Sequence, residues 1–131
     1  MNDCIFCKIS KKEIPASIIL EDENFLAFLD INQNTYGHTL IIPKQHASNL
    51  FETTNEIKEE IIFFVQKVKQ KLEENLQPKG FNVISNIGET AGQTVFHAHI
   101  HVLPRYEQDE FNFSYDSSKK VDLKELYEKI K

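Results

Sequence analysis

The stretch AGQTVFHAHIHVLPR, residues 91–105, places three histidines, His97, His99 and His101, at alternate positions. The whole chain has 5 histidines, so this concentration is not scatter. Small or apolar residues stand between them, and the alternation predicts a β-strand from Phe96 to Leu103. Because residues two apart on a strand point to the same face, we expect the imidazoles to form a row on one face and the apolar residues to face a core.

Four further short apolar runs predict strands on either side of a long helix. The runs cover residues 17–20, 25–30, 38–43 and 81–86. Apolar residues at three- and four-residue steps predict a helix from Asn55 to Gln77, with Thr53 and Glu56 as a capping box at its start. The segment from Val121 to Lys131 is expected to form a short amphipathic helix or an ordered tail.

The order of these elements and the chain length favour one α+β domain. With 131 residues the chain has the usual size of a single domain and can bury a core without disulfides. Strands that follow one another directly predict a mainly antiparallel sheet of about five strands. We expect the long helix to pack on this sheet and a short helix to follow at the C-terminal end.

Composition and charge exclude several classes of protein. Hydrophobic residues make up 40% and charged residues 27%, which is ordinary for a soluble globular protein. The net charge of −5 offers no bulk attraction to nucleic acid or to a membrane surface, so we expect neither as a partner. The first residues, MNDCIFCKIS, resemble neither a signal peptide nor a membrane span, so we expect a cytoplasmic protein.

The histidine row admits three interpretations. It could be the polar face of an exposed strand, although threonine or lysine would serve such a face equally well. Two histidines at alternate strand positions could instead bind one catalytic metal ion. In the third interpretation one imidazole is a nucleophile, because a free imidazole with a pKa of about 6.5 is available at neutral pH and can form a covalent intermediate.

Cys4 and Cys7 form a C-x-x-C motif near the start of the chain. A structural disulfide is not expected in a reducing compartment, and no strand precedes the motif as in redox proteins. A zinc knuckle is favoured over two buried small hydrophobic residues. A closed four-coordinate site needs two more ligands, for which the five histidines are the nitrogen candidates. His46 can supply one of them and the histidine row the other.

Taken together, the motifs resemble the histidine triad (HIT) superfamily. HAHIHVL (97–103) fits the family signature of histidines alternating with apolar residues. CIFCKI (4–9), FLAFLDINQNTYGHTLIIPKQH (25–46) and GQTVFHAHIHVLPR (92–105) resemble bacterial HIT proteins in order and spacing. The resemblance covers roughly Cys4 to Arg105. It implies a HIT-like fold over one domain, residues 1–131, and a homodimer.

The resemblance also implies an activity. Members of the family are hydrolases or nucleotidyl transferases that cleave at the α-phosphorus of a purine nucleotide, here a nucleoside phosphoramidate or a dinucleoside polyphosphate. His99 would be the nucleophile that becomes nucleotidylated, with His101 and His38 completing the catalytic group. Two alternatives stay open, a zinc-dependent hydrolase that uses the row as metal ligands and a non-catalytic nucleotide-binding module.

Four residues are implied as contacts of the nucleotide. Asp30 would hold the ribose hydroxyls. Gln93 and Thr94 would contact the phosphates, and Asn86 stands where relatives place another nucleotide contact.

A structural zinc is implied by the same resemblance. Relatives that contain zinc bind it through a C-x-x-C pair, one upstream histidine and the first histidine of the triad. In this chain these residues are Cys4, Cys7, His46 and His97. Because a zinc-bound His97 cannot donate a proton, the leaving group would take its proton from Thr94, a bound water or the substrate itself.

Overall fold

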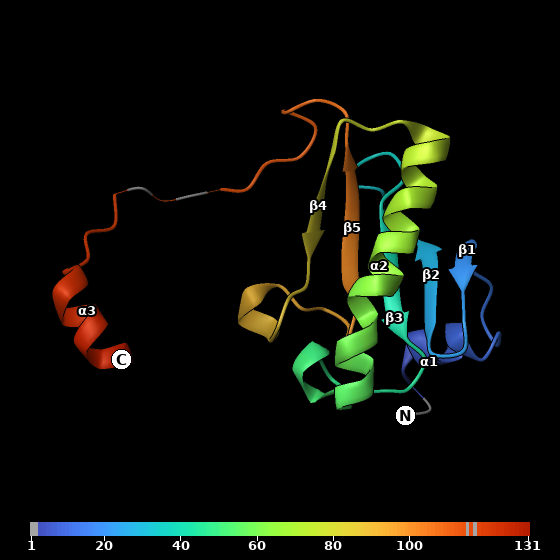
Figure 1. Cartoon of the computed structure of the whole chain (residues 1–131), viewed down its shortest axis with the longest axis horizontal. Coiled ribbons are helices and arrows are strands. Elements are labelled where there is room, and N and C mark those ends of the chain that lie inside the picture. The colour runs from blue at the N-terminus through green and yellow to red at the C-terminus, as the bar shows by residue number, and fades with distance from the viewer. Residues whose placement is uncertain (1–2, 115, 117) are drawn as a thin grey trace.

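The computed structural model describes residues 3–114, 116 and 118–131, and its centre is a five-stranded sheet (Figure 1). The strands are β1 (Ile18–Glu21), β2 (Phe25–Leu29), β3 (Thr39–Pro43), β4 (Gly80–Ile84) and β5 (Ile100–Arg105). They lie in the order β1-β2-β3-β5-β4, and each neighbouring pair is antiparallel. The predicted α+β class, with an antiparallel sheet of five strands, is confirmed.

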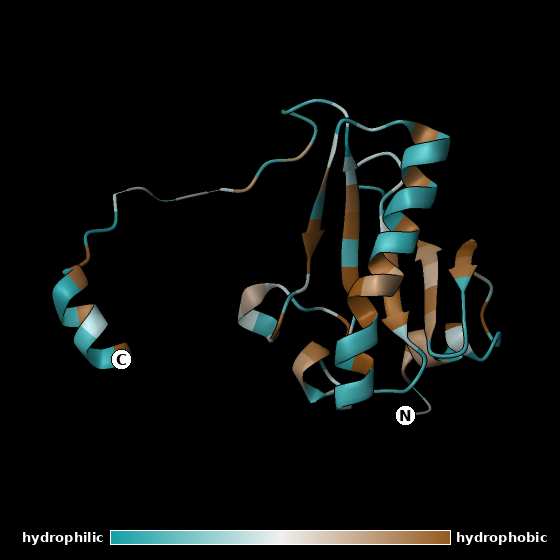
Figure 2. Ribbon diagram, viewed as in Figure 1, coloured by the Kyte–Doolittle hydropathy of each residue, from teal (hydrophilic) through white to brown (hydrophobic). Residues whose placement is uncertain are grey.

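Helix α2 (Asn55–Leu76) crosses one face of this sheet, as predicted (Figure 1). Its buried stripe consists of Ile57, Ile61, Phe64, Val65, Val68 and Leu72, and it packs against Phe25, Ala27, Ile41, Ile100 and Val102. Figure 2 shows hydrophilic residues over much of the remaining helix surface. Since each fully buried side chain of this size contributes about 1.5–3 kcal/mol, packing rather than helix propensity holds α2 in place.

Helix α1 (Ile5–Ser10) covers the opposite face of the sheet and was not predicted. Its side chains Phe6 and Ile9 join a second apolar cluster with Leu26, Phe28, Leu40 and Ile42. Strands β2 and β3 are therefore buried on both faces, which explains their continuous apolar runs. A helix of six residues is too short to show a periodic pattern, so the sequence carried no clear signal for it.

The residue predicted to cap the start of α2, Thr53, is wrong. Thr54 caps the helix, because its Oγ1 accepts from the Ile57 N–H at 3.3 Å. Thr53 instead follows the 3₁₀ turn η1 (Leu50–Glu52) and donates its hydroxyl to Leu50 O at 2.7 Å. With Thr54 as the N-cap, the residue three positions later is Ile57 rather than Glu56, so the capping-box pattern that favoured Thr53 is not formed.

Strand β5 begins at Ile100 rather than at the predicted Phe96. The Ala98 N–H donates to Ala47 O at 2.7 Å, so the chain before Ile100 is bonded to the segment that follows β3 and not to a strand. The strand also continues past Pro104, because Lys79 N–H donates to Arg105 O at 2.8 Å and extends the pairing with β4.

The described residues after position 117 include the predicted short helix, α3 (Leu123–Ile130) (Figure 1). No described residue of α3 is buried. Its apolar side chains Leu123, Leu126, Tyr127 and Ile130 are all exposed. None of the helices in the described ranges combines the length and the apolar character needed to cross a membrane.

Candidate functional site

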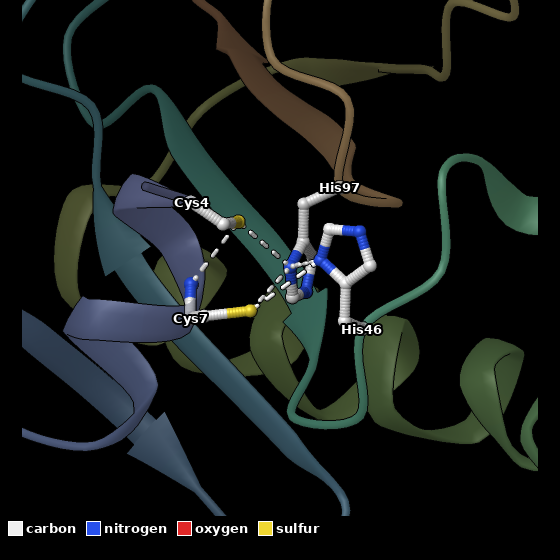
Figure 3. Close-up of side chains that lie close together, drawn as sticks. All are labelled: Cys4, Cys7, His46 and His97. Carbon is white, nitrogen blue, oxygen red and sulfur yellow. Dashed lines mark hydrogen bonds between the residues drawn. The ribbon is translucent and has the colours of Figure 1, made fainter. Parts of the chain in front are cut away.

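Four side chains from distant parts of the sequence converge between α1 and the sheet (Figure 3). Cys4 precedes α1 and Cys7 lies in its first turn, while His46 follows β3 and His97 precedes β5. The Sγ of Cys4 lies 3.4 Å from His97 Nδ1, and the Sγ of Cys7 lies 3.4 Å from His46 Nδ1. The two Nδ1 atoms are 3.2 Å apart. The structure thus brings together the four predicted metal ligands.

The spacing of these four atoms suits one tetrahedral zinc ion. With Zn–S bonds of about 2.3 Å and Zn–N bonds of about 2.0–2.1 Å, tetrahedral geometry sets S···N separations of about 3.5 Å and N···N separations of about 3.3 Å. The Cys7 Sγ···His97 Nδ1 distance of 3.5 Å and the distances above agree with both values. Two cysteines and two histidines leave no open position, which is the donor set of a structural site.

His97 links this cluster to the backbone of the sheet. Its Nε2–H donates to Pro43 O at 2.8 Å, so the lone pair of the neutral ring lies on Nδ1 and faces the cysteines. Burial is the main cause of a lowered pKa at His97, partly opposed by the bond to Pro43, and the ring is therefore neutral at neutral pH. Such a bond from the second nitrogen is how ligating histidines are usually held.

His99 is oriented by the residue two positions before it. Its Nδ1–H donates to the His97 carbonyl oxygen at 2.7 Å, which leaves the lone pair on Nε2. The Ser85 hydroxyl donates to the carbonyl oxygen of His99 at 2.7 Å and fixes the backbone there. Burial lowers the pKa of His99, with smaller opposing effects of the His97 carbonyl and the Asp30 charge. The arrangement provides a buried, neutral imidazole with a defined nucleophilic nitrogen.

His101, His38 and Asp30 form a second polar group beside His99. His38 Nε2 lies 2.9 Å from His101 Nδ1 and 3.5 Å from Asp30 Oδ2. The rings of His99 and His101 are 5.1 Å apart between centroids. Burial, followed by the charges of His99 and His38, lowers the pKa of His101 to about 4. Burial also lowers the pKa of His38, against the opposing effect of the Asp30 charge.

The histidine row lies on the face of the sheet that α1 covers, whereas the alternation predicted only that the histidines and the apolar residues between them would face opposite sides. The Phe6 ring contacts the rings of His97 and His99, with centroids 5.9 and 5.1 Å away. Ile100 and Val102 face α2 on the other side. Phe96, which was expected to face the core with them, is instead 49% exposed because it lies before the strand.

The predicted phosphate-contacting residues lie in the loop before His97. Gln93 is buried, and its Nε2 donates to Ser48 O at 2.6 Å and to Val95 O at 3.0 Å. Its Oε1 accepts from the Gly88 N–H at 2.9 Å. The side-chain amide therefore fastens the loop that contains the turn η2 (Glu89–Ala91). Thr94, next to it, is exposed.

The predicted ribose contact and the fourth nucleotide contact are partly exposed. Asp30 directly follows β2, and its Oδ1 accepts from the Asn32 N–H at 2.8 Å, which fixes the carboxylate beside His38. Asn86 Nδ2 donates a long bond of 3.5 Å to Gly92 O. Phe6, Asn32 and Ser85 position the site but were not singled out from the sequence, because their roles rest on backbone bonds and ring contacts that have no local motif.

Known proteins share both the sequence and the fold. The chain is 48% identical over 104 residues to Protein hit of Bacillus subtilis, which covers 79% of this chain and 72% of that protein. It is 40% identical over 106 residues to adenosine 5′-monophosphoramidase of Schizosaccharomyces pombe, covering 81% and 77% of the two chains. It is 40% identical over 108 residues to adenylylsulfatase of Arabidopsis thaliana, covering 82% of this chain and 55% of that protein.

Two solved structures resemble this one closely. A Streptococcus mutans protein superposes with a TM-score of 0.88 at 45% identity, over 98% of this chain and 81% of its own. A zinc-bound histidine triad family protein from Mycobacterium smegmatis superposes with a TM-score of 0.79 at 42% identity, over 88% and 84% of the two chains. The sequence model of the HIT domain matches residues 11–108. The chain therefore belongs to the HIT domain family.

Proposed function

We propose that this protein is a nucleotide hydrolase that cleaves at the α-phosphorus of a purine nucleoside phosphoramidate or a dinucleoside polyphosphate. The observation that carries the proposal is the bond from His99 Nδ1 to the His97 carbonyl, which directs the free lone pair of Nε2 away from the backbone. Similarity to an adenosine 5′-monophosphoramidase and to an adenylylsulfatase supports an adenosine nucleotide as substrate.

The reaction proceeds in two displacements at phosphorus. In the first, His99 Nε2 forms a bond to the α-phosphorus while the bond to the leaving nitrogen or oxygen breaks, and the leaving group takes up a proton from Thr94, a water or the substrate itself. In the second, water attacks the phosphorus and releases the nucleotide and the free imidazole. A covalent intermediate divides one difficult displacement into two easier ones. His101 and His38 support His99 through their ring contacts.

The nucleotide is held by neutral donors and by Asp30. The Asp30 carboxylate accepts hydrogen bonds from the ribose hydroxyls. Thr94 and the loop that Gln93 fastens meet the phosphates, and Asn86 adds a further contact. Preorganised donors can stabilise the charge that develops on the phosphoryl oxygens without a positively charged surface, which agrees with a net charge of −5.

We assign Cys4, Cys7, His46 and His97 to one structural zinc ion. The ion would tie α1 to the segments before β5 and after β3, and so hold the carbonyl that orients His99. A zinc-dependent hydrolase that uses the histidine row is less well supported. Within the described ranges, the two groups of side chains spaced to hold a metal ion take up His97 and His101 separately, and neither includes His99, so the row does not form one metal site. A non-catalytic binding module gives no role to the orientation of His99 Nε2.

We further propose a single domain that functions as a cytoplasmic homodimer. Helix α3 exposes four apolar side chains and stands away from the sheet (Figure 1). A stable amphipathic helix needs a surface to cover its apolar side, and a second copy of the chain can provide one. Sedimentation of the full chain, compared with the same chain carrying Leu126→Glu, tests it.

A turnover screen tests the proposed function. Purified protein is incubated with adenosine and guanosine phosphoramidates, nucleoside monophosphate esters and dinucleoside polyphosphates. We expect release of a nucleoside monophosphate from at least one class, and none from the His99→Ala variant. Nucleotide binding without turnover of any class would favour the binding module.

A further inference from the structure

The group formed by Asp30, His38 and His101 has the composition of a metal site. Its three donor atoms lie within 4.8 Å of one another, and two imidazoles with one carboxylate form a donor set that zinc, cobalt and iron use where one coordination position stays open. We propose that this group binds a divalent transition-metal ion as a second site, separate from the zinc of Cys4, Cys7, His46 and His97.

Two of the three distances between the donor atoms are close to those of a tetrahedral site. Three nitrogen or oxygen donors around a tetrahedral ion, each about 2.0–2.1 Å from it, lie about 3.3 Å from one another. His38 Nε2 lies 2.9 Å from His101 Nδ1 and 3.5 Å from Asp30 Oδ2. Binding therefore opens the histidine pair by a few tenths of an ångström and draws the carboxylate towards His38 by less. The carboxylate oxygen and the His101 nitrogen, which lie within 4.8 Å of each other, also have to reach this separation.

The backbone of Asn32 already holds two of the three ligands. Its N–H donates to Asp30 Oδ1 at 2.8 Å, which leaves Oδ2 free towards the histidines. Its carbonyl oxygen lies 3.2 Å from His38 Nδ1 and accepts the proton of that nitrogen in the tautomer that has its lone pair on Nε2. In the other tautomer Nδ1 accepts from the Asn34 N–H at 3.3 Å, so the ion selects the tautomer bonded to Asn32. Ligating histidines and carboxylates are commonly oriented by such bonds from their second atom.

The hydrogen bond between His38 Nε2 and His101 Nδ1 needs one proton between the two nitrogens, and when His38 carries its own proton on Nδ1 that proton belongs to His101 Nδ1. The ion takes the place of this hydrogen bond, and the proton of the His101 ring moves to its Nε2, so that both rings bind in the neutral form. Asp30 and His101 are partly exposed, which leaves the ion a route from solvent, whereas His38 is 1% exposed. The ion would occupy the Asp30 oxygen that we assign to the ribose, so, given the proposed function, it competes with the nucleotide.

Cobalt(II) added to the zinc-loaded protein tests this site without any substrate. Four-coordinate cobalt gives visible d–d absorption, and cysteine ligands add a thiolate charge-transfer band in the near ultraviolet. We expect cobalt to bind with d–d bands and no thiolate band. The bands should be lost in Asp30→Asn and in His38→Gln, and kept in the control Asp109→Asn, which changes an exposed carboxylate elsewhere.

The proposed site is overturned if the wild type binds no cobalt, or if both Asp30→Asn and His38→Gln still bind it. A thiolate band together with d–d bands that do not depend on Asp30 and His38 would place the cobalt at the cysteine cluster alone, which also contradicts the proposal. Adenosine monophosphate should displace the cobalt, and failure to do so overturns the competition alone. The absorption is measured without turnover, so a negative result contradicts only the metal site. The hydrolase proposal is tested separately, by the turnover screen.

Discussion

The carbonyl oxygen of His97 accepts the Nδ1–H of His99 at 2.7 Å, while the ring of His97 points into the cysteine cluster. One residue thus serves two neighbouring sites, through its side chain in one and through its backbone in the other. A metal ion held by His97 would also steady the tautomer of the nucleophile. The cysteine cluster and the histidine row are therefore joined through one residue.

Replacement of His99 by alanine should abolish turnover and leave nucleotide binding largely intact. The lost group acts on the chemical step, so we expect turnover to fall by roughly 10³-fold or more. Mass spectrometry after rapid acid quench should find one nucleotide on the peptide that contains His99 in the wild type, and none in the variant. Turnover close to that of the wild type in His99→Ala would contradict the covalent mechanism.

Elemental analysis should find about one zinc per chain, as expected for one four-coordinate site. Cys4→Ser should lose the zinc and melt at a lower temperature, because the ion joins α1 to the rest of the fold. Lys11→Ser, at an exposed position of the same segment, is the matched control and should keep the zinc. A wild type without metal, together with a normal melting temperature for Cys4→Ser, would rule the site out.

Asp30→Asn should weaken the preference for ribose over deoxyribose. The substitution keeps the shape of the side chain but removes the charged acceptor of the ribose hydroxyls, and charge-assisted hydrogen bonds are about twice as strong as neutral ones. The ratio of kcat/KM for paired ribose and deoxyribose substrates measures the effect. Equal rates for the two substrates already in the wild type would show that the carboxylate has another role.

Stability should fall with pH on the acidic side partly because of His101. Its pKa is about 4 in the folded protein and about 6.5 in the unfolded chain, so the unfolded chain takes up the proton first as pH falls. The contribution of the neutral His101 ring to the free energy of unfolding is complete above the pKa of the unfolded chain. Below that pKa it decreases by up to about 1.4 kcal/mol per pH unit. Urea unfolding at several pH values should give a shallower slope for His101→Gln, which retains the cysteine cluster. Parallel slopes would show that His101 is not buried as described.

Gln93→Ala should destabilise the loop before His97. The change leaves the Gly88 N–H and the Ser48 and Val95 carbonyls without the amide that now pairs with them. Unpaired buried polar groups cost about 1–3 kcal/mol, and we expect a loss of stability in that range. Thermal unfolding should show this for Gln93→Ala but not for Thr90→Ala, an exposed position in the same loop. Equal melting temperatures would mean that the amide bonds are dispensable.

Local patterns were sufficient for most of the elements. The apolar stripe of α2 and the short apolar runs of the strands follow from burial on one or two faces, which leaves a mark in the sequence itself. The two ends of β5 and the cap of α2 could not be obtained in this way. They depend on hydrogen bonds from Ala98 to Ala47, from Lys79 to Arg105 and from Ile57 to Thr54. Which partners form these bonds depends on how the neighbouring segments of the chain are placed.

The sequence by itself determined the residue types of the site, their order and their side of the sheet, because alternation along a strand and a C-x-x-C pair are short-range patterns. Only the tertiary structure decided which nitrogen each histidine presents. For His97 the choice follows from the carbonyl of Pro43, which is far away in the sequence. For His99 it follows from the carbonyl of His97, two residues before it. The reason is physical: a neutral imidazole has one proton for two nitrogens, and the acceptor nearest to one of them settles which nitrogen keeps its lone pair.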